Sequence, residues 1–267
     1  MKRLNLSVIM SLIAIVLLLP SGSWAAEKEA VKLTLEDIKV ADETIGLPSA
    51  VEILSNLQKS NIKFTPDTAN SDISKYTTKE QRSLNLGRLI SQAAVSVTVK
   101  DADSLSILAY SIEALGKTFG VSGTIEKRRE KIIDFVKKGD WDQATTEVVQ
   151  LESWVKQEIV SLRNPDAVRL ANVGGWITGL YLATKGLMGN YTPEASKILR
   201  APALTADLIA QMAKLPENLQ TGVSKQIMTA LPEIKRLVSV NQEESISLES
   251  VKELNRISSG LVKAMAE

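Results

Sequence analysis

The amino-acid sequence predicts an all-α fold, arranged as an antiparallel multi-helix bundle or as a short α-solenoid of stacked helical hairpins. Apolar residues recur at three- and four-residue spacing along most of the chain, and no sustained run alternates at period two. Residues that start and stop helices divide this pattern at short intervals. Short connections between helices favour antiparallel neighbours, which both arrangements provide.

Residues 1–25 have the order of a secretory signal peptide. Lys2 and Arg3 precede an apolar run at residues 12–19, and small residues lead to a cleavage site before Ala26. The apolar run is shorter than the roughly 20 residues that a membrane-spanning helix needs. We therefore expect cleavage, a periplasmic location and no stable membrane anchor.

The composition excludes several classes of site. The chain contains no cysteine and no histidine, so disulfides, lipid attachment at a cysteine, serine–histidine catalysis and the usual zinc, haem and iron–sulfur ligand sets are excluded. Without residues 1–25 the chain has 30 basic and 31 acidic residues, a net charge of −1. We expect no cofactor, no metal and no nucleic-acid partner.

Three segments are expected along the chain. After the signal peptide at 1–25, residues 26–76 form an N-terminal extension with one helix, which starts at Pro48 and reaches Leu57, and a polar linker at 65–76. Residues 77–267 form the main helical domain.

The first helices of the main domain are delimited by capping residues. Thr77 or Thr78 starts a helix, with Glu80 or Gln81 positioned to complete a capping box. Asp101 starts the second helix, and the next two span 124–138 and 140–163, separated by Gly139. The buried candidates of the first two helices are Leu84, Leu86, Leu89, Ile90, Ala93, Ala94, Val97, Leu105, Leu108, Ala109, Ile112 and Leu115.

The later helices are delimited mainly by prolines. Asn164 and Pro165 form a cap and first turn of a helix that reaches Met188, and residues 192–194 repeat that start signal. Further breaks are expected near Pro202, Pro216 and Pro232, the last of which ends or kinks a helix because proline lacks an N–H donor. A final amphipathic helix starts at Ser247.

One hairpin favours the solenoid. Residues 138–144 resemble the turn and second-helix start of a tetratricopeptide repeat, and Phe135 lies where that family places an aromatic residue. Ile132 stands where the family has a small residue, and no second copy follows one period away. The alternative interpretation is a tight helical hairpin.

One glutamate indicates a possible enzymatic function. Glu152-Ser153 and the run at 186–188 resemble fragments of lytic transglycosylase motifs, although the residues around Glu152 depart from that family's pattern. A glutamic acid in a dry groove could protonate a glycosidic oxygen. A solvated carboxylate on a helix face is the alternative interpretation of Glu152.

A basic cluster at residues 127–131 is interspersed with Glu126 and Glu130 on one helix. We expect its side chains to form solvated salt bridges, and a face that docks a partner is the alternative.

The candidate binding residues lie in and after a glycine-rich helix. Glycine costs a helix interior about 1 kcal/mol relative to alanine, so three glycines between 174 and 179 require a reason. Close approach of a second helix is one, with Gly175 and Gly179 on one face and Trp176 packed nearby. A groove for an apolar ligand is the other, with Tyr181 and Tyr191 as its further aromatic walls.

These observations lead to two functional hypotheses. The first is an exported, non-enzymatic binding or scaffold protein that holds a protein partner or an apolar small ligand, using a helical surface or the glycine-bounded groove. The second is a carboxylate-dependent enzyme that acts on cell-wall glycans.

Overall fold

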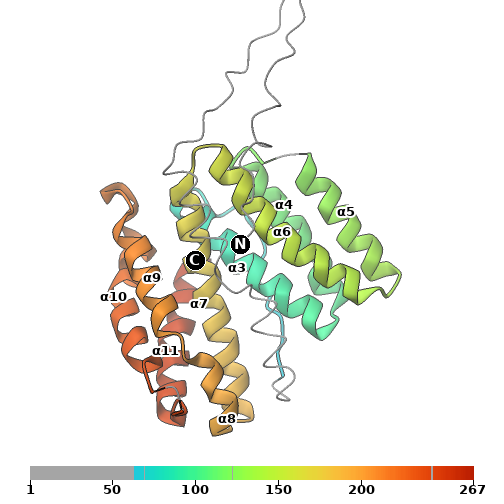
Figure 1. The fold of residues 1–267 in the computed structure, drawn as a ribbon. Coiled ribbons are helices and arrows are strands. Elements are labelled where there is room, and N and C mark those ends of the chain that lie inside the picture. The colour runs from blue at the N-terminus through green and yellow to red at the C-terminus, as the bar shows by residue number, and fades with distance from the viewer. Residues whose placement is uncertain (1–62, 69, 122, 242) are drawn as a thin grey trace, which may run out of the picture. The chain divides into compact units, whose positions relative to one another are not determined.

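The computed structural model describes residues 63–267, except 69, 122 and 242 (Figure 1). In this part of the chain all regular elements are helices, which confirms the all-α prediction. They are α3 (Lys79–Val99), α4 (Ala102–Lys117), α5 (Thr124–Lys137), α6 (Trp141–Ser161), α7 (Pro165–Gly189), α8 (Pro193–Ser196), α9 (Pro202–Ala213), α10 (Gly222–Val238) and α11 (Leu248–Ala266), with short 3-10 helices η1 (Lys197–Leu199) and η2 (Glu217–Leu219). The predicted signal peptide and the predicted helix after Pro48 lie outside the described residues.

Helices α3 and α7 form the centre of the bundle. They pack extensively against each other; α3 also contacts α4, α6 and α11, and α7 also contacts α6, α9 and α11. Figure 1 shows α5 and α6 on one side of α7, and α10 and α11 on the other. In a solenoid each helical hairpin packs only against the adjacent hairpins, whereas α3 packs most extensively against α7, four helices further along the chain. The described helices therefore form a bundle.

Several predicted helix starts are confirmed by their hydrogen bonds. The Gln81 N–H donates to the Thr78 hydroxyl at 3.1 Å, and the Gln81 side chain accepts from the Thr78 N–H at 3.2 Å. Asp101 caps α4, and Ser247 caps α11. Gly139 follows α5 with a φ of 72°, a conformation that glycine adopts without a steric penalty.

Two boundary predictions differ from the structure. Asn164 precedes α7 as predicted, but its side chain makes no capping hydrogen bond. Pro232 was expected to end or kink a helix; it lies inside α10, which continues to Val238, so the helix does not end there. Pro232 is exposed, and the opposite side of α10 buries Ile227, Leu231 and Ile234. Burial of that apolar face outweighs the hydrogen bond that proline removes.

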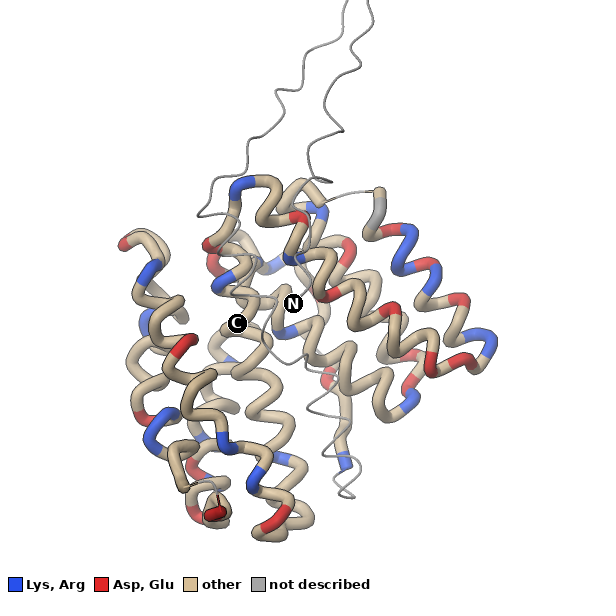
Figure 2. The backbone as a smooth tube through the Cα atoms, viewed as in Figure 1, with Lys and Arg blue, Asp and Glu red and all other residues tan. Residues whose placement is uncertain are grey.

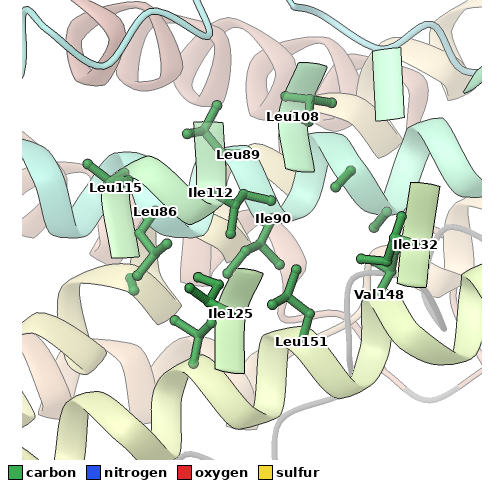
Figure 3. Close-up of a cluster of buried hydrophobic side chains, with 14 of the residues drawn as sticks. Leu86, Leu89, Ile90, Leu108, Ile112, Leu115, Ile125, Ile132, Val148 and Leu151 are labelled. Carbon is green, nitrogen blue, oxygen red and sulfur yellow. The ribbon is translucent and has the colours of Figure 1, made fainter. Parts of the chain in front are cut away.

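The bundle contains two hydrophobic clusters. The first joins α3, α4, α5 and α6 to the first part of α7 and to Leu182 of the same helix, and Figure 3 shows side chains from all four of the earlier helices in contact across it. The second joins most of α7 to the helices that follow, together with Leu84 of α3. Phe64 and Tyr181 pack against both clusters. All twelve of the buried candidates predicted for α3 and α4 are buried.

Helix α3 is buried on every side, which its sequence does not indicate. All residues from 83 to 97 are buried, including Ser83, Asn85, Arg88 and Gln92. Most of their polar groups have partners inside the protein: the Ser83 hydroxyl donates to the Lys79 carbonyl, and the Asn85 amide donates to the Met265 carbonyl of α11 at 2.6 Å. The Gln92 Nε2 is an exception and makes no hydrogen bond with the residues that the structure describes. A polar helix face can be buried when hydrogen bonds replace its contacts with water.

Arg88 forms the most extensive of these buried networks. Its Nε donates to Asn85 Oδ1 at 2.6 Å, and its Nη2 donates to the Asn70 carbonyl at 2.5 Å and to the Tyr76 hydroxyl at 3.0 Å. The Asp67 N–H also donates to the side chain of Gln92. The polar segment predicted as a linker is therefore a loop that is attached to α3 by hydrogen bonds.

Tyr76 makes this network sensitive to high pH. Burial raises the pKa of its phenol above the ordinary value of about 10, although the nearby Arg88 opposes the shift. Because the folded pKa is raised, the stability from the neutral phenol is complete below about pH 10 and is lost as pH rises through the folded pKa. We expect Tyr76→Phe to cost about 1–2 kcal/mol near pH 8 and progressively less above pH 10. Urea unfolding of both proteins across this range measures it, and a constant difference would contradict the assignment.

A glutamate from α3 caps a helix far away in sequence. The N-terminal residue of α10 receives no side-chain cap from Thr221. Instead, the Ser224 N–H donates to Glu80 Oε1 at 2.6 Å. A carboxylate at this end is favourable because the first N–H groups of a helix lack partners and its dipole is positive there. Glu80 thus couples the start of α3 to the start of α10.

Candidate functional site

The glycine-rich segment of α7 packs against the backbone of α3. A Cβ atom at Gly174 would lie 2.9 Å from the Leu84 carbonyl carbon, with the carbonyl oxygen closer still. A Cβ atom at Gly87 of α3 would lie 2.6 Å from the Gly175 nitrogen. Real Cβ atoms essentially never approach other atoms to within 3.0 Å. The two helices therefore meet backbone to backbone, and sequence reasoning missed both Gly174 and Gly87 as the closest points.

The two predicted glycines differ from each other. A Cβ at Gly175 would lie 3.3 Å from the Gly87 oxygen and 3.4 Å from the Ser91 hydroxyl, and that hydroxyl donates to the Gly175 carbonyl at 2.9 Å. Gly175 is therefore part of the close helix crossing, as expected. At Gly179 a Cβ would meet no atom within 4 Å. The expectation that Gly179 shares the close approach is wrong.

The three predicted aromatic residues all pack against the second hydrophobic cluster. Trp176, Tyr181 and Tyr191 are half-buried there. The Tyr191 hydroxyl donates to the Ile246 carbonyl at 2.9 Å, which holds the loop before α11. The side chain of Asn255 donates to the Tyr181 carbonyl at 3.4 Å and so joins α11 to α7. These contacts explain the aromatic residues as parts of the packing of the bundle.

A pocket of about 450 Å³ lies away from these residues. It opens between η2 and α10 and is lined by Glu217, Gln220, Lys225, Met228 and Thr229. None of the five predicted binding residues lines it. Four of its five lining residues are polar and three are exposed, so it has little of the apolar enclosure that characterises small-molecule sites.

The outer face of α4 exposes two large apolar side chains. Ile107 is 46% exposed and Tyr110 is 54% exposed. Both stand outside the stripe of Leu105, Leu108 and Ile112 that faces the core. That contrast was the signal in the sequence: α4 has more apolar residues than its buried face requires. A pair of exposed apolar residues one turn apart on a helix is a candidate interaction surface.

The ring of Tyr110 packs against an ion pair that is largely buried. The Arg129 guanidinium of α5 lies over the Tyr110 ring, 4.5 Å from its centre, and its Nε also pairs with the Glu113 carboxylate. Glu113 further pairs with Lys117 at 2.5 Å. Burial acts to lower the pKa of Arg129, but the Glu113 carboxylate outweighs it and the pKa is raised. Arg129 is therefore a fixed cation against which the ring rests.

A similar arrangement joins α5 to α6. Glu147, whose side chain is 9% exposed, pairs with Arg128 at 3.1 Å and with Lys131 at 3.4 Å. Arg128 also lies 5.8 Å from the centre of the Trp154 ring. Figure 2 shows basic and acidic residues alternating along α5. The predicted salt bridges of the 127–131 cluster are therefore present, and three of these basic residues bind buried carboxylates of the neighbouring helices.

The carboxylate of the enzymatic alternative has a basic partner. Glu152 pairs with Lys156 at 2.7 Å, one turn along α6, and both side chains are largely buried. Among residues 63–267 as described, no group of three or more acidic residues lies close enough together to hold a metal ion. Within the same part of the chain, no helix combines the length and apolar character needed to span a membrane.

Comparison of the chain with protein-family models, curated proteins and solved structures finds no match in any of the three. The proposed function therefore rests on the residues of this chain and their arrangement.

Proposed function

We propose that the protein is an exported, non-enzymatic binding protein that presents the outer face of α4 to a protein partner. Export rests on the order of charged, apolar and small residues in 1–25. Binding rests on Ile107 and Tyr110, which are about half exposed on a helix whose other side is fully packed. Buried aromatic anchors surrounded by polar residues provide much of the affinity in protein interfaces.

A protein partner fits this surface better than a small ligand. The α4 face is a ridge on one helix, and apolar small molecules bind in concave sites that enclose most of their surface. Of the residues predicted to form a groove, Gly175 packs against α3, and Trp176, Tyr181 and Tyr191 pack against the second cluster. The sequence suggested two binding surfaces, a helical surface and a glycine-bounded groove. We therefore retain the helical surface and assign it to α4.

Site-specific cross-linking in cells tests this proposal. A photoreactive amino acid at Ile107 should form covalent products with a protein partner, several-fold above the same amino acid at Met188. Met188 is a matched control because it is 39% exposed and lies on α7, away from the α4 face.

Equal and weak cross-linking at the two positions would overturn the binding proposal. Release of soluble fragments from purified cell wall, abolished by Glu152→Gln, would instead establish the enzymatic alternative. Under the binding proposal neither the wild-type protein nor that variant releases such fragments.

A further inference from the structure

Five residues share the outer face of α4 because they recur at spacings of four and three. They are Asp103, Ile107, Tyr110, Ala114 and Lys117, and we call them the α4 stripe. Four of them are exposed, and Ala114 is half-buried. The stripe has an apolar middle, an acid near its N-terminal end and a base at its C-terminal end.

The arrangement of the stripe is complementary to itself. Tyr110 lies seven residues from Asp103 and seven residues from Lys117, or about 10 Å in each direction along the helix. A two-fold axis beside Tyr110 would place Asp103 opposite Lys117 of a second copy, and Lys117 opposite Asp103 of that copy. A parallel arrangement would place like charges together, which is unfavourable.

The residue at the centre is prepared for such a contact. Arg129 lies over the Tyr110 ring, so little side-chain freedom remains to be lost on binding. More than half of the residue is still exposed. Two tyrosine rings that meet at a symmetry axis can stack or pack edge to face, and each also covers Ile107 of the other copy.

The charged ends can also take part. The side chain of Lys117 is 50% exposed although it pairs with Glu113. Its ammonium has three donors and can therefore reach a second carboxylate as well. Asp103 lies in the first turn of α4, where it is exposed.

We propose that the partner of the α4 stripe is a second copy of this chain, bound antiparallel with the two Tyr110 residues at the two-fold axis. This inference rests on the proposed binding function and names its partner. Such an interface is isologous, so it closes after two copies. One stripe buries an area at the low end for protein interfaces, so we expect a reversible dimer whose population depends on concentration.

Sedimentation velocity of the purified protein over a range of concentrations tests the association. We expect a concentration-dependent dimer that Tyr110→Ser abolishes and Tyr110→Phe retains, because phenylalanine keeps the ring. Asp103→Lys should weaken the dimer and reverse the salt dependence of the wild type, because it places two lysines opposite each other. Met188→Ser should behave as the wild type. Circular dichroism melting of each variant establishes that a lost dimer does not reflect a lost fold.

The geometry is tested by cysteines, which the chain otherwise lacks. One variant carries Ser106→Cys and the other carries Ala114→Cys, and each position lies four residues from Tyr110. One of the two variants also carries a size tag, and the two proteins are mixed and treated with a short bismaleimide. The two-fold arrangement predicts products that join position 106 to position 114. Products that join each position to itself would overturn it.

The result at Ile107 in cells separates the two proposals. A cross-linked product of two copies of this chain supports both. A product with a different protein, together with a monomer at all concentrations, overturns the dimer and leaves the binding function intact. No product at Ile107 above the Met188 control overturns both.

Discussion

Replacing Gly174 with alanine should destabilise the protein by about 3 kcal/mol or more, or prevent it from folding. The added methyl group would fall within 3.0 Å of the Leu84 carbonyl, and a backbone atom cannot move aside as a side chain can. Gly87→Ala should have a comparable effect, because its Cβ would meet the backbone of α7. Urea unfolding monitored by circular dichroism measures both losses.

Gly179→Ala is the matched control for this prediction. It lies in the same helix, five residues further on, and its Cβ would meet nothing within 4 Å. Alanine also loses less backbone entropy than glycine in a helix interior, so we expect a gain of about 0.5–1 kcal/mol. Equal effects at Gly174 and Gly179 would show that helix propensity, and not the α3–α7 crossing, determines the cost.

Replacing Arg88 with methionine should cost about 3 kcal/mol. Methionine approximates the length of the side chain but leaves Asn85 Oδ1, the Asn70 carbonyl and the Tyr76 hydroxyl without their donor. Buried acceptors that lose a charged donor carry a large desolvation penalty. Arg88→Lys should restore only part of the stability, because an ammonium cannot reproduce the planar set of donors.

Arg256→Ala provides the comparison for Arg88. Arg256 pairs with Glu253 on the surface of α11, and its side chain is 71% exposed. Because exposed ion pairs contribute little, its removal should leave the urea midpoint unchanged. A more stable Arg88→Met variant would contradict our account, because it would show that burying the charge costs more than its hydrogen bonds return.

Local signals in the sequence predicted most helix boundaries correctly. The Thr78 capping box, the Asp101 and Ser247 caps and Gly139 act through hydrogen bonds or backbone conformation within a few residues, so they can be read from neighbouring positions. Pro232 does not end its helix, for the complementary reason. Its local cost is outweighed by apolar contacts that α10 makes with other helices.

At the candidate site, signals from neighbouring positions in the sequence predict only part of the packing. The glycines of α7 indicated a close helix approach, but only the position of α3 shows that Gly174 and Gly175 need it and Gly179 does not. Trp176, Tyr181 and Tyr191 have the composition of a groove, yet all three are half-buried against the second hydrophobic cluster. Ile107 and Tyr110 are exposed although their residue types favour burial, because no later helix covers their face of α4.

The sequence by itself determined the helical class, the helix ends and the absence of histidine and cysteine chemistry, because periodicity, capping and composition are properties of nearby residues or of their identities. The tertiary structure alone decided which helices lie at the centre. Polar α3 is buried on all sides because Gly87 and Gly174 allow backbone contact with α7 and because distant partners satisfy several of its polar groups. Those partners are up to 180 residues away, and helical periodicity does not report contacts across that separation.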